Sequence, residues 1–510
     1  MKRFWIVCLS VPILLSSGFL LLRNSVQAEK SDAPALKPTY DIPFEVPGKA
    51  GDHNPPEFYL FSWEEFFALN WPATVPTGQP PLRGVPDTDK TIGDSGPRVW
   101  ETWKSDFELF PAQPGYPGKI IQPTPWNSWD QPEPVCGAEH PAADAKLLPL
   151  LAKGESVIPG GVNQAMGGPL VDQHLQYVRY EIRVNETEYN ETKDKQWFLR
   201  RNLSTYPKPR NEFSSSHPGH YGPIEIKASW RILTDAEANA TPPRFYMSKA
   251  WVVDPKHPTH CTQVTVGLVG LHIAHKTEQF PAWVWSTFEQ VDNVPSSDQP
   301  PAQGYSFNNS KASQPAEWGF CVVHDGNCPT PPDPDITPQS YAPVAPQDLP
   351  IPPKWPIQTA RVNPIPANGA TELNRLVHEL PGIKGTVWQY YELVAGQWQN
   401  DAYPHPPIKV SNPASSEDLY SQLKGFPADA VANVTMETFF QGKTPGDPTN
   451  LIDLRIFGTS CLHCHYQAAQ YDFSWVLADA AWPSAPASQG PGHPCDRDGI
   501  RHGSPDDRTA

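Results

Sequence analysis

The sequence predicts an α+β fold with a β-rich body, short helices, long Pro-rich loops and a small helical segment near the C-terminus. The 510 residues include 63 Pro, about twice the average usage, which disfavours long helices. Apolar and polar residues alternate in several segments in the middle of the chain, as they do in half-buried strands. Aromatic residues make up 11% of the chain, with 18 Trp, and this is ample material for a packed core.

The N-terminus has the pattern of a secretory signal. Lys2 and Arg3 precede the apolar run 4–22, and SVQA at 25–28 is typical of a cleavage site after Ala28. An uncleaved anchor helix is the alternative, because the run approaches the length of a short membrane span, but Pro, Ser and Gly interrupt it. We expect residues 1–28 to be removed, leaving a periplasmic or secreted chain that does not span a membrane.

Two aromatic-rich segments predict helices at the start of the body. In SWEEFFALNWPA (62–73), Ser62 and Glu65 have the spacing of a capping box, and Pro72 marks the end. RVWETWKSDFELF (98–110) is the second. Its aromatic residues recur at helical spacing, which favours core packing over cofactor contact: Trp100, Trp103 and Phe107.

Strands are expected to dominate the rest of the body. QYVRYEIRVNETEY (176–189) and PIEIKASWRIL (223–233) alternate with a period of two, and QVTVGLVGLHIAHK (263–276) is a mostly apolar buried strand. Two aromatic-rich segments, 282–290 and 387–394, fit either a strand or a helix.

The second half contains a Pro-rich segment and further helices. ATELNRLVHEL (370–380) predicts a helix whose apolar face carries Leu373, Leu376 and Val377, and short helices are expected over 415–426 and 433–443. The expected organisation is a signal peptide (1–28), a β-rich body with opening helices (29–328), a Pro-rich connection (329–366), a C-terminal region (367–480) and a Pro/Gly-rich tail (481–510).

The charge balance restricts the partners. The chain carries a formal net charge of −16, and loss of Lys2, Arg3 and Arg23 with the signal gives −16 − 3 = −19. A strongly acidic exported protein repels nucleic acid and anionic lipid, so we expect no nucleic-acid partner and, where a protein partner exists, a basic one.

Seven cysteines remain after the signal, and most should be paired in an oxidising compartment. Cys321 and Cys328 in CVVHDGNC enclose a Gly-containing turn and are the first disulfide candidates. Among Cys136, Cys261 and Cys495, one further bridge leaves one thiol, and the sequence does not say which.

The two remaining cysteines, Cys461 and Cys464, form a C-x-x-C-H motif with His465 in CLHCH. Two thiols at this spacing can add to the two vinyl groups of a haem, and the next imidazole then lies under the iron as its proximal ligand. A zinc site would need a second pair of ligands, and a redox dithiol would need a βαβ setting, and neither stands out. The motif predicts one covalently bound haem c.

The sixth iron ligand is left open between several residues. Met436 lies in a segment that could fold back over the haem, although core packing is its ordinary role. His272 and His275 lie on one apolar strand and face opposite ways, so at most one reaches the iron. His pairs at H-x-x-H spacing could hold a second metal, but no third ligand accompanies them.

Three functions remain open, and no catalytic residue can be named. The first is a monohaem cytochrome that exchanges electrons with a redox partner protein. The second is a haem oxidoreductase or small-gas-binding protein whose open distal site takes a small-molecule substrate of the nitric oxide, peroxide or hydroxylamine type. The third is an aromatic-rich ligand-binding protein with a structural or relay haem.

Several blocks resemble a bacterial family that is known only as cytochrome c family proteins with a single C-terminal haem motif. These blocks cover most of the mature chain: FALNWPA (67–73), WETWK (100–104), IEIKASWRIL (224–233), VGLHIAHKT (269–277), WVWSTFEQVDNVP (283–295), NVTMETFF (433–440) and SCLHCHYQAAQYDFSWVLA (460–478). The resemblance implies export and haem but no settled reaction. The pattern from Cys464 to Phe473 is also similar to the end of β-sheet cytochromes that oxidise hydroxylamine or bind nitric oxide. The haem-linked Lys of the hydroxylamine-oxidising members is not assigned in this sequence.

Overall fold

In the computed structural model the chain forms two units, Met1–Leu36 and Lys37–Ala510. The described residues are 36–48, 55–110, 122–129, 136, 141–142, 144–148, 163–164, 167–203, 211–254, 257–295, 304–308, 356–357, 359, 361, 364–399, 431–438, 461–465, 468 and 471–479. The expected signal peptide, the Cys321–Cys328 disulfide, the helix over 415–426 and the tail 481–510 lie outside them. So does most of the Pro-rich connection.

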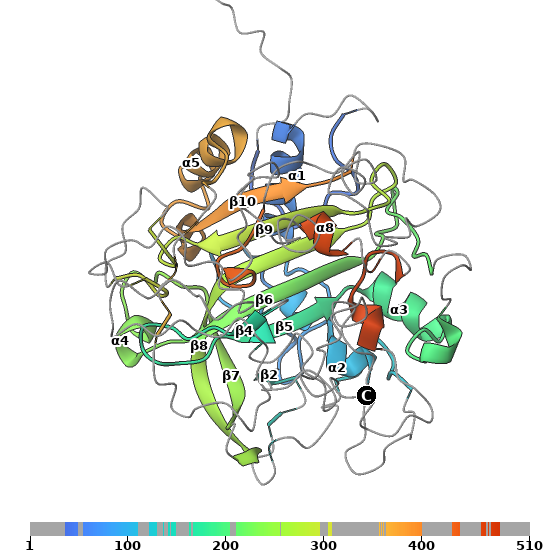
Figure 1. Ribbon diagram of the computed structural model, residues 1–510, viewed down its shortest axis with the longest axis horizontal. Helices are drawn as coiled ribbons and strands as arrows, with labels where there is room; N and C mark the ends of the chain where they lie inside the picture. Colours follow the sequence, from blue (N-terminus) through green and yellow to red (C-terminus); the bar gives the residue numbers. More distant parts are fainter. Residues whose placement is uncertain are drawn as a thin grey trace, which may run out of the picture. The chain divides into compact units, whose positions relative to one another are not determined.

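One mixed sheet dominates the described part of the chain. Its order is β1-β5-β6-β8-β7-β2, with β9 paired to β8 and β10 paired to β9 (Figure 1). The strands are β1 (Lys104–Ser105), β2 (Lys146–Leu148), β5 (Arg179–Val184), β6 (Ile224–Ile232), β7 (Met247–Asp254), β8 (His257–His275), β9 (Val284–Gln290) and β10 (Tyr391–Gln397), beside a separate pair, β3 (Asn163–Gln164) and β4 (Gly167–Pro169).

The helices are few and short. They are α1 (Pro55–Leu69), α2 (Asp106–Leu109), α3 (Glu186–Asp194), α4 (Asp235–Ala238), α5 (Glu372–His378) and α8 (Cys461–His465), with single turns η1 (Trp100–Thr102), η2 (Arg200–Asn202), η4 (Ala367–Thr371), η5 (Val387–Tyr390) and η8 (Val476–Asp479). The prediction of a β-rich α+β body is therefore confirmed. The helical character of the whole C-terminal region stays a prediction, because α8 is its only described α-helix beyond α5.

The strands expected from alternation are present as β5 and β6, and the strand expected from a mostly apolar run is present as β8. The segment 176–189 is a strand only as far as Val184. Asn185 then accepts a hydrogen bond from the Glu188 backbone N–H (3.1 Å) and begins α3. An N-cap asparagine therefore ends the strand, since its side chain satisfies a free N–H of the new helix. The two ambiguous segments supply β9 and β10.

The predicted start of the first helix is wrong. Helix α1 begins at Pro55, where a missing N–H costs nothing, so Ser62 and Glu65 lie inside it. The Ser62 hydroxyl donates to the Phe58 carbonyl (2.7 Å) and contacts Ser286 on β9, and Glu65 binds His275 on β8. Both side chains thus serve tertiary contacts instead of a cap.

The second predicted helix, over 98–110, is also wrong. The chain forms η1, becomes extended at Trp103 (ψ 164°), pairs with β5 as β1, and forms α2. The real capping box is Ser105–Glu108, with both reciprocal bonds present. Trp100 and Trp103 are buried, as expected. Their packing in the tertiary core does not require the helix that their spacing predicted.

Two smaller expectations have mixed outcomes. The helix expected over 370–380 is present as η4 and α5, but Leu376 on its predicted apolar face is 50% exposed. In the segment expected to be helical over 433–443, the described residues 431–438 form turns. Cys136 and Cys261 form a disulfide, one of the pairings that the sequence left open.

The main sheet has two chemically different faces. On the face called here the α1 face, Phe66 of α1 packs against Phe288 of β9 (ring centroids 4.4 Å). On the opposite face, called the C-terminal face, cross-strand rows that include several polar residues meet the segment 431–438 and the described residues between 461 and 479, and Figure 1 draws α8 in front of β9. The rows are Glu225–Ala274–Trp285, Lys227–His272–Thr287 and Ser229–Gly270–Glu289.

None of the helices in the described ranges combines the length and the apolar character that crossing a bilayer requires.

Candidate haem-binding site

The segment 431–438 lies directly on the C-terminal face. The Asn433 amide donates to the Thr287 hydroxyl (3.0 Å) and the Phe288 carbonyl (2.9 Å), and the Val434 N–H donates to Glu289 (2.8 Å). A Cβ at Gly270 would lie 2.3 Å from the Thr435 hydroxyl. Glycine at 270 therefore permits the close approach of this segment to the sheet.

Helix α8 contains the C-x-x-C-H motif beside β10. The Leu462 N–H donates to the Gln397 side-chain oxygen (3.2 Å), and the Leu462 side chain is fully buried. Cys461 is half-buried. The side chains of His463 and Cys464 lie outside the described part, so the expected outward position of His463 and the role of Cys464 stay predictions.

The imidazole of His465 is held in one orientation. Its Nδ1 donates a hydrogen bond to the Phe473 carbonyl (2.7 Å), which leaves Nε2 as the nitrogen for a metal. The loop that presents this carbonyl is strained, because Asp472 (φ 57°) and Phe473 (φ 68°) both adopt the left-handed region without being glycines. Metal-binding histidines commonly have such a backbone acceptor on the other ring nitrogen.

The surroundings keep the His465 ring neutral. Desolvation by the surrounding protein, with smaller contributions from His272 and Lys227, lowers the pKa of His465 to about 4, against the opposing effects of the hydrogen bond to Phe473 and of Glu437. The ring of Trp285 lies 4.0 Å from the imidazole, centroid to centroid. A neutral imidazole is the form that binds iron.

Of the two proposed sixth ligands, His272 is the one that contributes to the lowered pKa of His465. Its Nε2 donates to Glu437 (3.0 Å), while Nδ1 is buried and has no hydrogen-bond partner among the described residues. Burial raises the pKa of Glu437, but His272 and Lys227 outweigh this and lower it. The nitrogen that would ordinarily face an iron is therefore engaged with a carboxylate.

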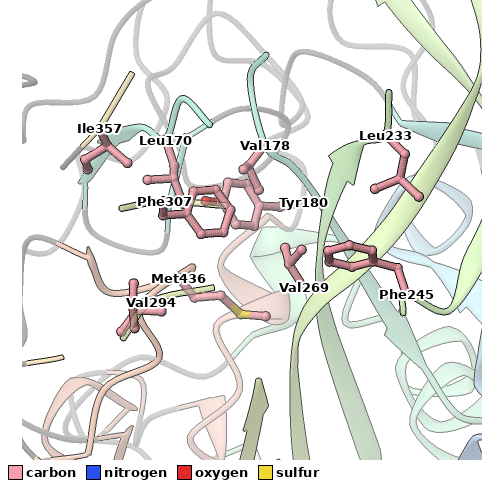
Figure 2. Packing of buried hydrophobic residues seen from close by; sticks show 11 residues of the cluster. Leu170, Val178, Tyr180, Leu233, Phe245, Val269, Val294, Phe307, Ile357 and Met436 are labelled. Atoms are coloured by element: carbon pink, nitrogen blue, oxygen red, sulfur yellow. The ribbon is translucent and has the colours of Figure 1, made fainter. Parts of the chain in front are cut away.

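Met436, the other proposed sixth ligand, packs in a hydrophobic cluster (Figure 2). It is fully buried with Tyr180, Val269 and Val294, and its backbone N–H donates to the Asn433 carbonyl (3.1 Å). The ordinary core role weighed from the sequence accounts for this position.

The other histidine pairs do not form a second metal site in the described part of the chain, where no group of three or more His, Cys, Asp or Glu could hold a metal ion. His275 lies between Glu65 and Ser216 on the α1 face (2.6 Å to each). His217 and His220 stack in a turn. The prediction that His272 and His275 face opposite ways is confirmed.

The donor types described here are ones that a haem c uses. The motif provides a neutral, oriented imidazole at His465 and a half-buried cysteine at Cys461. Sequence reasoning missed Phe473 as the acceptor, Trp285 as the ring neighbour and Glu437 as the partner of His272. Their only sequence signal was membership in the blocks that carry the family resemblance.

Comparison with protein-family models, with curated proteins and with solved structures found no match.

Proposed function

We propose that the chain is an exported monohaem c-type cytochrome that transfers single electrons through one covalently bound haem. The observation that carries the proposal is the His465–Phe473 hydrogen bond (2.7 Å) directly after a C-x-x-C pair. It is the arrangement expected of a proximal ligand whose tautomer is fixed.

The residues have distinct roles in this proposal. Cys461 and Cys464 form the thioethers, and His465 holds the iron through Nε2. When bound, the haem supplies a one-electron redox centre. The Phe473 carbonyl keeps the imidazole aligned, burial keeps it neutral, and Trp285 packs against one side of it. The acidic chain would meet a redox partner protein through basic groups on that partner.

A second function is favoured by a specific observation: both proposed sixth ligands are engaged elsewhere. Met436 is in the hydrophobic cluster, and the His272 Nε2 is bound to Glu437. An iron without a second strong protein ligand binds small molecules such as nitric oxide, peroxide or hydroxylamine.

Expression in cells that assemble c-type cytochromes tests the first proposal. The purified chain should show a haem absorption spectrum that survives denaturation, and Cys461→Ala together with Cys464→Ala should remove it. The matched control, the double substitution of Cys136→Ala and Cys261→Ala, breaks the disulfide instead and should leave haem attachment intact. A colourless wild-type chain, or one whose haem is extracted on denaturation, would refute the proposal.

Carbon monoxide separates the two functions. Rapid binding to the ferrous protein, with a high-spin ferric spectrum, indicates an open position and supports the second function. A low-spin spectrum without carbon monoxide binding supports electron transfer alone. The variant His272→Gln then shows whether this histidine is the sixth ligand, since only a ligand would change the ferrous spectrum on replacement.

A further inference from the structure

Two buried carboxyl groups lie side by side next to the proximal loop. Glu188 on α3 and Glu225 on β6 are 0% and 8% exposed, and each carboxyl group interacts directly with the other. Both oxygens of Glu188 and Oε1 of Glu225 have no hydrogen-bond donor from any other described residue. Glu225 belongs to the C-terminal face, in the row that contains Trp285.

This arrangement requires a bound proton. Ionised carboxylates are acceptors only, so two of them cannot hydrogen-bond each other unless one is protonated. Two buried negative charges in contact are also unfavourable, and such pairs share one proton. The buried oxygens that no other donor satisfies therefore point to a proton as the ligand of this pair.

The pair is connected to the proximal histidine through a few bonds. Glu225 hydrogen-bonds the side chain of Ser474, and Ser474 follows Phe473, whose carbonyl accepts from His465. Asp472, on the other side of Phe473, binds Lys276 (2.5 Å) and accepts from the Phe213 N–H (2.9 Å). The same strained loop thus contacts both the acid pair and the imidazole.

The charges around the pair are mostly negative. Burial raises the pKa of Glu188 well above its ordinary value, and Glu225, Glu191 and Asp472 raise it further. Burial also raises the pKa of Glu225, to about 7, with Asp472 adding to it against hydrogen bonds from Glu188 and Ser474. Lys276 is already paired with Asp472 and lies 3.8 Å from Glu212.

We propose that Glu188 and Glu225 form a proton-binding site coupled to the haem, so that uptake of one electron by the iron is accompanied by uptake of one proton at this pair. The inference rests on the proposed haem binding and extends it from electron transfer to proton-coupled electron transfer.

The step balances. A one-electron donor, such as a redox partner protein, would reduce ferric iron to ferrous iron, and a proton from solvent would add to the carboxylate of the pair that is still ionised. Reduction removes one positive charge from the haem, which favours the proton on a nearby carboxylate. Because linkage is reciprocal, protonation of the pair raises the midpoint potential by the same free energy.

The midpoint potential of the haem-loaded chain, measured from below to above pH 7, tests the coupling. It should fall as the pH rises around the pKa of Glu225, with a limit of about 59 mV per pH unit for one proton per electron. Glu225→Gln and, separately, Glu188→Gln should make this slope smaller. Glu212→Gln, an exposed carboxylate near Lys276, should keep the wild-type slope.

A second readout is infrared spectroscopy. The reduced-minus-oxidised difference spectrum should contain a carboxylic acid C=O band that disappears in Glu225→Gln. A wild-type potential that is independent of pH, or variants with the wild-type slope and band, would overturn the coupling alone. A chain that binds no haem would instead overturn the proposed function and this extension together.

Discussion

Each face of the main sheet buries a glutamate, on neighbouring strands, and the pKa values of these two glutamates are shifted in opposite directions. On the α1 face, Glu181 of β5 binds Lys146 and Arg183 and accepts a hydrogen bond from the Trp230 indole (2.7 Å). Burial alone would raise its pKa, but the two cations outweigh this and lower it to about 2. On the C-terminal face, Glu225 has another carboxyl group as its neighbour, and its pKa rises to about 7.

The difference shows that the partner, and not the degree of burial, decides the charge of a buried carboxylate. Glu181 and Glu225 are 6% and 8% exposed. One is fixed as an anion by its neighbours, and the other is poised to exchange a proton near neutral pH. Strongly perturbed groups in contact with a candidate site are expected where chemistry takes place, whereas satisfied ion clusters hold elements together.

The largest effect is expected on the α1 face. Glu181→Ala would leave Lys146 and Arg183 as buried cations that have lost a common partner, and loss of one member of a buried pair costs about 3–5 kcal/mol. Denaturant unfolding should show this decrease. Lys384→Ala, which breaks an exposed pair with Glu379, should cause no measurable change. Equal effects of the two substitutions would contradict the view that the α1-face cluster is structural.

A smaller and pH-dependent effect is expected on the C-terminal face. The folded-state pKa of Glu225 is raised above its ordinary 4.5, so its contribution is complete below about pH 4.5 and is lost as the pH rises through about 7. The unfolding free energy of the wild type should therefore fall over this window, and that of Glu225→Gln should fall less.

The contribution of Glu181 to stability depends on pH in the opposite direction. Its pKa is lowered to about 2, so its contribution is present above about pH 4.5 and is lost as the pH falls toward 2. Unfolding free energies measured across both windows would thus separate the two faces. A wild-type curve that is flat between pH 4.5 and 7, or a Glu225→Gln curve parallel to it, would count against the raised pKa.

The strands of this fold could be read from the sequence more reliably than its opening helices. Apolar and polar residues alternate along β5 and β6, and this pattern is local, although nearly all residues of both strands are buried in the fold. The segment 98–110 has helical aromatic spacing but pairs with β5 at Lys104, a contact that depends on residues far along the chain. Ser62 and Glu65 have the spacing of a capping box. In the fold, however, Ser62 hydrogen-bonds Ser286 and Glu65 hydrogen-bonds His275.

The same limit applies to the candidate site. The C-x-x-C-H motif is local and was identifiable at once. The residues around the motif are not local to it. Trp285 comes from β9, and the position of the Phe473 carbonyl depends on two left-handed residues. Glu188 contacts Glu225 only after α3 packs on the sheet. Residues that tune a site through the fold leave no spacing pattern in the sequence.

The smallest effect is expected where the C-terminal face is apolar. Met436 is fully buried in a cluster with Tyr180 and Val269, and Met→Leu conserves the volume of such a site. Met436→Leu should therefore cost less than about 1.5 kcal/mol in unfolding free energy and leave the ferrous absorption spectrum unchanged. Loss of a low-spin spectrum in this variant would show instead that the sulfur binds the iron. The hydrophobic cluster would then have to open on haem binding, and the C-terminal face would be more adaptable than the α1 face.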